Sequence, residues 1–147
     1  MKILVLNGPN LNMLGVREPE LYGRRTYQDL EDYVNQCAAE LGLEVELFQS
    51  NWEGALVEKI QSAYGTADGL VINAAAYTHT SVALLDALKA VGLPAVEVHL
   101  TDPERREPFR RLSYVGMACE KRFAGCGFEG YRLALEHLAR RGGAAQT

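Results

Sequence analysis

The sequence predicts a doubly wound α/β protein with three layers, in which helices cover both faces of a five-stranded parallel sheet. Short apolar runs that stop at turn or polar residues alternate with longer segments of helical spacing along the 147 residues. The first run, Ile3–Leu6, is apolar throughout, which is typical of a strand buried on both faces. The length fits one domain, which we expect over residues 1–141, followed by a disordered tail at 142–147.

The first half of the chain is expected to hold two strands and two helices. A long polar loop follows the first strand, and a helix over 26–41 then begins at a threonine cap and ends before a glycine. Residues 44–49 alternate polar and apolar side chains, which indicates a strand covered on one face. Ser50 or Asn51 caps the second helix, which we expect to end near Tyr64.

The second half repeats this alternation. Residues 69–72 form another fully apolar strand, a helix follows over 80–91, and residues 95–98 form the fourth strand. A more polar strand near 118–123 and a last helix over 128–140 complete the pattern. Periodicity alone does not give the order of the strands in the sheet.

Polar side chains recur directly after the first, third and fourth strands. They are Asn10, Arg17 and Tyr22, then Asn73 and His79, and then His99, Thr101 and Arg110. The carboxyl ends of parallel strands meet at one edge of a sheet, where open α/β proteins bind their ligands. We therefore expect a single cleft lined by these residues.

Tyr22 is the candidate base in this cleft. A free phenol has a pKa of about 10, so only ~0.1% of it is ionised at neutral pH. A guanidinium within a few ångströms lowers an acidic pKa by roughly 1–3 units, and Arg17 lies five residues away on the same loop. The pair is compatible with a tyrosinate base, whereas without the other site residues a surface tyrosine and an exposed arginine are the more frequent explanation.

His99 is the candidate acid, because it ends an otherwise apolar strand that also holds Glu97. Residues two apart on a strand point to the same face, so the carboxylate can orient the imidazole and set its charge. Such a histidine can pass a proton to a leaving hydroxyl near neutral pH. A strand histidine on its own is more often a core residue.

The remaining candidates supply hydrogen-bond donors and charge. Asn73, His79 and the backbone N–H groups of Leu100 and Thr101 form an array that suits a carboxylate or a hydroxylated ring. Arg110 adds a positive charge. Taken singly, each of these residues is explained as well by a helix cap or a surface position.

Other functions find less support in the sequence. A net charge of −4 leaves no overall basic field for nucleic acid, and no apolar segment is long enough to span a membrane, so we expect a cytoplasmic protein. The three cysteines and three histidines lack ligand spacing, so we expect no metal and no disulfide. Gly8 precedes a proline rather than a phosphate-binding helix, and Ser81 lacks the glycines of a nucleophile elbow.

Two classes other than an enzyme stay open from the residues alone. One is a binding module that holds flavin or another anion at the same edge, and the other is a purely structural oligomer. The absence of a phosphate-cradling loop argues against the first. The second leaves Arg17, Tyr22 and His99 unexplained.

Four segments resemble motifs of the type II 3-dehydroquinate dehydratases, within a similarity that covers residues 2–138. They are Asn7–Asn12, Arg17–Glu20, Tyr22–Gly23 and Glu97–Leu100. The resemblance implies a flavodoxin-like fold with strand order 2-1-3-4-5. It also implies a lyase of the shikimate pathway that converts 3-dehydroquinate to 3-dehydroshikimate and water by anti elimination through an enolate, without cofactor or metal.

The resemblance further implies a role for each site residue. Tyr22 would be the base, His99 the acid oriented by Glu97, and Arg17 the group that stabilises the transition state, while Asn10 would hold a water at the enolate. The substrate-binding positions would be Asn73, His79, Asp86, Leu100, Thr101 and Arg110. In the family the residue matching Asp86 reaches in from a neighbouring subunit of a dodecamer built from four trimers, and the loop over 17–24 forms a lid.

Three stretches depart from the family pattern. Ala74–Ala75 stands where Pro-Gly is common, residues 101–105 replace a loop that usually begins Ser-Asn, and residues 116–126 are more polar than the usual fifth strand. None of these changes removes a proposed catalytic side chain. We expect them to affect substrate affinity or subunit packing.

Overall fold

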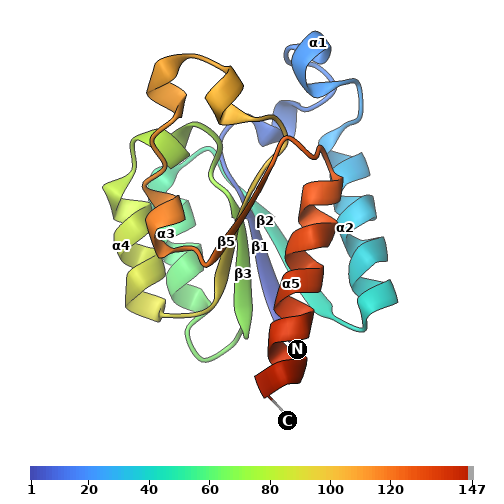
Figure 1. Ribbon diagram of the computed structural model, residues 1–147, viewed down its shortest axis with the longest axis vertical. Helices are drawn as coiled ribbons and strands as arrows, with labels where there is room; N and C mark the ends of the chain where they lie inside the picture. Colours follow the sequence, from blue (N-terminus) through green and yellow to red (C-terminus); the bar gives the residue numbers. More distant parts are fainter. Residues whose placement is uncertain (146–147) are drawn as a thin grey trace.

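Five parallel strands form one sheet with the order β2-β1-β3-β4-β5 in the computed structural model, which describes residues 1–145. Helices lie on both faces of this sheet (Figure 1). The strands are β1 (Lys2–Asn7), β2 (Glu44–Gln49), β3 (Gly69–Asn73), β4 (Ala95–His99) and β5 (Lys121–Ala124). The α-helices are α1 (Pro19–Tyr22), α2 (Tyr27–Leu41), α3 (Glu53–Ser62), α4 (Val82–Val91) and α5 (Glu129–Ala145). The predicted fold class and strand order are confirmed.

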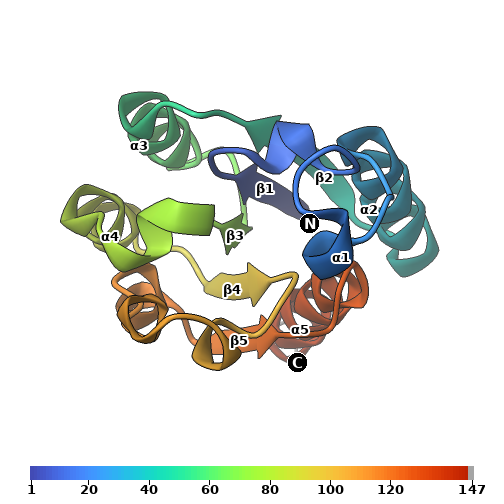
Figure 2. The same cartoon turned by 90° about the horizontal axis from the view of Figure 1, so that it is seen from above.

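Two hydrophobic clusters lie on opposite sides of the sheet, because side chains alternate between the faces of each central strand. On β1, Ile3 and Val5 belong to the cluster that α2 and α5 cover, whereas Leu4 and Leu6 belong to the cluster that α3 and α4 cover. Figure 2 shows these two pairs of helices on either side of the strands. The run of four apolar residues is therefore buried on both faces, as its composition predicts.

The register of the strands brings their carboxyl ends to one edge. Asn7 at the end of β1 is paired with Gln49 of β2 and with Asn73 of β3. On β4, Glu97 is level with Ile72, so His99 extends just past this line. Polar residues that follow three separate strands thus come together above the sheet.

Side-chain hydrogen bonds explain where α2 begins and why Ser50 and Asn51 do not cap α3. Thr26 and Asp29 form a capping box at the start of α2, as the threonine predicts. The second helix, α3, was expected to start at Ser50 or Asn51, but it starts at Glu53 and ends before Tyr64. Both side chains are used elsewhere, since Ser50 Oγ accepts a hydrogen bond from Trp52 N and Asn51 Oδ1 accepts one from Asn10 N.

The segment after β4 differs most from the predicted pattern. It contains three short 3₁₀ turns, η3 (Pro103–Arg105), η4 (Pro108–Arg110) and η5 (Val115–Ala118), before the last strand starts at Lys121. The strand was expected from Ala118. Val115 is fully buried in the cluster beneath α4, with Ala118 packed against it, so this stretch covers a helix instead of extending the sheet.

The last helix is longer than predicted. It continues to Ala145, so residues 142–145 are helical where we expected a disordered tail, and residues 146–147 lie outside the described part of the chain. An ion pair of 2.9 Å between Arg141 and Glu120 ties this end of α5 to the start of β5. No helix in the described part is long and apolar enough to cross a membrane.

The buried hydroxyl of Tyr131 gives a stability prediction. This side chain on α5 donates a hydrogen bond to Asn7 Oδ1 at 2.6 Å and accepts one from Asn73 Nδ2 at 3.0 Å. Tyr131→Phe removes a partner from two buried amides and should lower the free energy of unfolding by roughly 1–3 kcal/mol, as measured by urea denaturation. Tyr64→Phe, at a side chain that is 73% exposed, should change it by no more than about 0.5 kcal/mol.

Candidate active site

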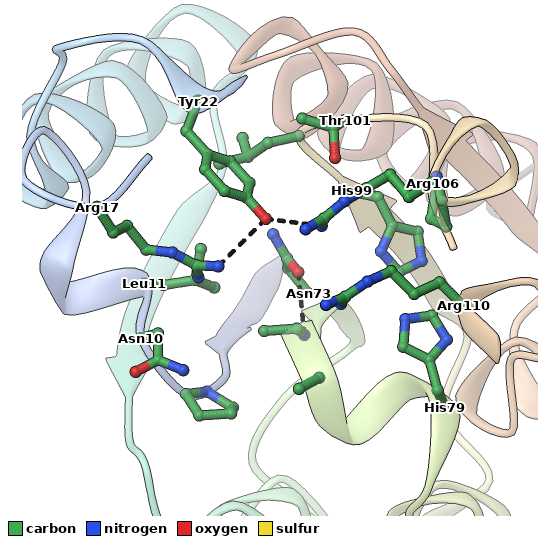
Figure 3. A pocket seen from close by; sticks show the side chains of 15 residues that line it. Asn10, Leu11, Arg17, Tyr22, Asn73, His79, His99, Thr101, Arg106 and Arg110 are labelled. Carbon is green, nitrogen blue, oxygen red and sulfur yellow. Dashed lines mark hydrogen bonds between the residues drawn. The ribbon is translucent and has the colours of Figure 1, made fainter. Parts of the chain in front are cut away.

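A cavity of about 150 Å³ lies at the carboxyl edge of the sheet, and its lining includes Arg17 and Tyr22 from the segment that carries α1. Figure 3 shows side chains from three separate parts of the chain pointing into it. Among the predicted site residues, those that line the cavity are Asn10, Arg17, Tyr22, Asn73, His79, His99, Leu100, Thr101 and Arg110. The expected convergence of three strand ends on one site is therefore present.

The loop after β1 places Tyr22 over the cavity. Asn10 adopts a left-handed conformation with φ of 68°, which an asparagine tolerates, and the chain turns there into the 3₁₀ turn η1 (Leu11–Met13). Leu11 is buried in the hydrophobic cluster under α2 and α5, which anchors the turn. The loop ends in the short helix α1, whose last residue is Tyr22.

Two guanidinium groups surround the phenolic oxygen of Tyr22. Arg106 Nη1 donates a hydrogen bond to it at 2.7 Å, and Arg17 Nη2 donates one at 3.3 Å (Figure 3). The Arg17 guanidinium also lies 4.5 Å from the centre of the tyrosine ring. The Tyr22 oxygen therefore accepts hydrogen bonds from two positively charged side chains.

Arg106 is a site residue that the sequence analysis missed. Its shorter hydrogen bond makes it the nearer of the two cations to the Tyr22 oxygen. In the sequence it belongs to a cluster of four arginines at 105, 106, 110 and 111, and nothing local separates them. Only the folded structure distinguishes these arginines, because Arg106 and Arg110 line the cavity whereas Arg105 is 88% exposed.

His99 forms a buried pair with Glu97. The imidazole Nε2 lies 2.5 Å from Glu97 Oε2, and the carboxylate side chain is only 1% exposed. Burial raises the pKa of Glu97, but hydrogen bonds from His99 and Ser113 and the charge of Arg122 outweigh burial, so this pKa lies below its ordinary value. An ionised Glu97 accepts the Nε2 proton, and Nδ1 is then the nitrogen left to exchange a proton with a ligand.

His79 contributes a ring whose orientation is fixed from behind. Its Nδ1 lies 2.7 Å from the carbonyl oxygen of Leu112, which can only accept, so Nδ1 carries the proton. Burial lowers the pKa of His79, and the nearby charges of His99 and Arg110 lower it further, against the opposing effect of the Leu112 carbonyl. In the neutral ring Nε2 is therefore an acceptor for a donor in the cavity.

Asn73 is held by two neighbours that the sequence did not indicate. Its Nδ2 donates to the buried hydroxyl of Tyr131, and its Oδ1 accepts a hydrogen bond from Ala75 N at 3.2 Å. Ala75 has a left-handed backbone with φ of 52°, a conformation that costs an alanine roughly 1 kcal/mol. The Ala-Ala variation noted after Asn73 thus places a strained residue in the wall of the cavity.

Two predicted residues lie outside the lining of the cavity. Glu97 is behind His99 and reaches a ligand only through the imidazole. Asp86 is exposed on α4 and does not line the cavity of its own chain. No group of three or more histidine, cysteine, aspartate or glutamate side chains arranged to hold a metal ion occurs in residues 1–145.

Comparison with known proteins identifies relatives of the whole domain. The family model described as Dehydroquinase class II matches residues 1–139. A 3-dehydroquinate dehydratase from Bartonella henselae is 54% identical over 96% of this chain and 95% of its own length, and one from Geotalea daltonii is 55% identical over 94% and 96%.

A solved structure agrees with these relatives. The type II dehydroquinase from Butyrivibrio crossotus superposes with a TM-score of 0.92 at 46% identity, covering 94% of this chain and 97% of that one. Sequence and structure are thus alike from β1 to the last helix, and the chain belongs to the class II dehydroquinase family.

Proposed function

We propose that the protein converts 3-dehydroquinate to 3-dehydroshikimate and water, the third step of the shikimate pathway. The observation that carries this proposal is that one cavity holds a tyrosine bonded to an arginine and, separately, a histidine paired with a buried carboxylate. An elimination needs a base for the carbon-bound proton and a separate acid for the departing hydroxyl. Family membership supplies the substrate.

In the proposed mechanism the Tyr22 phenolate removes the proton next to the ketone of the substrate. The electron pair of that bond forms an enolate, which a water held near Asn10 stabilises. Collapse of the enolate forms the ring double bond and breaks the carbon–oxygen bond, and His99 gives its proton to the leaving hydroxyl, which departs as water. In this proposal Tyr22 on α1 and His99 on β4 act on opposite faces of the substrate ring, as anti elimination requires.

Charged side chains beside Tyr22 and His99 support the proposed roles of these two residues. Arg17 and Arg106 stabilise negative charge on the Tyr22 oxygen before and during proton removal. Glu97 stabilises the protonated imidazole of His99 from behind. These groups act without a cofactor or metal in the proposed reaction.

The remaining lining residues bind the substrate in this proposal. Arg110 provides positive charge, and Asn73 and His79 provide hydrogen bonds to hydroxyl groups. The backbone N–H groups of Leu100 and Thr101 suit the substrate carboxylate, since such donors bind anions well. The α1 loop, which carries both Arg17 and Tyr22, would close over the ligand as a lid.

Asp86 completes the site only if another subunit supplies it. The side chain is exposed on α4 and absent from the cavity lining of its own chain. We propose that the protein acts in the cytoplasm as a homo-oligomer, and that this oligomer is a dodecamer of four trimers, as the family resemblance implies. A monomer at assay concentration in analytical ultracentrifugation would contradict this assembly.

The proposed function is tested directly by mixing the purified protein with 3-dehydroquinate in the presence of a chelator. Ultraviolet absorbance should rise as the conjugated enone carboxylate of the product forms. Tyr22→Phe should lower kcat by at least about 10³-fold and leave substrate binding within a few fold, because it removes the proton acceptor and keeps the ring. Failure of the wild-type protein to form product, or full activity in Tyr22→Phe, would contradict the assignment.

The role of Arg106 has a matched control one residue away. Arg106→Gln removes the 2.7 Å hydrogen bond to Tyr22 and should lower kcat by roughly 10²-fold. Arg105→Gln changes an exposed arginine and should leave kcat near wild type. Equal effects of the two substitutions would show that only the general charge of the segment matters.

A further inference from the structure

The segment that follows the two cavity arginines contributes one more residue to the site. We propose that Ser113 is a positioning residue, which keeps the Glu97 carboxylate turned toward His99 and away from Arg122. The inference rests on the proposed function, in which His99 gives the proton to the leaving hydroxyl. Ser113 does not line the substrate cavity, so it acts through Glu97.

The hydroxyl of Ser113 has a fixed direction. Its oxygen accepts a hydrogen bond from Gly116 N at 2.9 Å, and its own proton is donated to Glu97 Oε2 at 2.6 Å. The backbone on either side is also tied down, since Tyr114 N donates to Thr78 O and the Leu112 carbonyl accepts from His79. Ser113 therefore presents a donor from a well-anchored segment.

Glu97 has two neighbours, His99 and Arg122, that compete for its carboxylate. Oε2 accepts from His99 at 2.5 Å, whereas Oε1 lies 3.8 Å from Arg122 Nε, too far for a hydrogen bond. Arg122 Nε is buried and has no hydrogen-bond partner within residues 1–145. Because an unsatisfied buried donor is unfavourable, Arg122 attracts the carboxylate away from His99.

The space behind Glu97 would allow that movement. A second cavity of about 390 Å³ is lined by Glu97, Ser113, Gly116 and Arg122, among others. A Cβ added at Gly116 would lie 2.7 Å from Glu97 Oε1, so the glycine keeps this side of the carboxylate open. The Ser113 hydrogen bond thus holds Oε2 beside His99 against both the free space and the charge of Arg122.

Ser113→Ala removes the hydroxyl and tests the proposal. We expect kcat to fall about tenfold, because the carboxylate no longer supports proton donation by His99, with KM within twofold. In a crystal structure of this variant, Glu97 should lie within hydrogen-bond distance of Arg122 and more than about 3.2 Å from His99. Ser113→Cys keeps the shape with a weaker donor and should give an intermediate kcat. Ser62→Ala, whose exposed hydroxyl bonds only the nearby Lys59 carbonyl, is the control and should match wild type.

A second substitution separates positioning from a general effect on folding. If Ser113 opposes the attraction of Arg122, then Ser113→Ala combined with Arg122→Gln should recover kcat to within about threefold of Arg122→Gln alone. Additive losses in the double variant, or Glu97 unmoved in the crystal structure of Ser113→Ala, would overturn the proposal. If the wild-type protein fails to act on 3-dehydroquinate, the proposed function fails, but the position of Glu97 in the variant still decides the role of Ser113.

Discussion

The site depends on the register of the central strands. Asn7 and Asn73 are paired at the ends of β1 and β3, and the hydroxyl of Tyr131 on α5 links their side chains from below. A shift of one residue in a strand would turn its side chains to the other face and break this link. Because the strands end at nearly the same level of the sheet, the loops after β1, β3 and β4 meet around one small cavity.

Opposite charges lie on two sides of the cavity. Arg106 and Arg17 donate hydrogen bonds to the Tyr22 oxygen, whereas the buried carboxylate of Glu97 lies behind His99. In the proposed mechanism the arginines face the base and the carboxylate faces the acid, so each reacting side chain has a neighbour of the charge that its role requires.

The sequence indicates the fold well and the site in part. Apolar runs and helical spacing identify β1, β3 and β4, because central strands and amphipathic helices leave strong periodic signals. Arg17, Tyr22 and His99 could also be named, because the first two lie on the loop after the first strand and His99 ends the fourth. Arg106 and Tyr131 could not, because one is among four similar arginines and the other lies on the apolar face of a helix. The start of α3 was missed because side chains that resemble caps bond to loop atoms instead.

The irregular backbone after β4 is explained by the different positions that three of its side chains occupy. Arg106, Arg110 and Ser113 are spaced by four and three residues, so a continuous helix would place all three on one face. In the structure these side chains make different contacts. Arg106 donates a hydrogen bond to Tyr22, and Arg110 lines the cavity together with His79. Ser113 donates a hydrogen bond to Glu97, which lies behind His99. Pro103 and Pro108 each begin a 3₁₀ turn, and Pro108 interrupts any helix that would continue from Pro103, since proline lacks the backbone donor that a helix interior requires. The turns after β4 thus allow one short segment to reach Tyr22, the cavity and the carboxylate behind His99.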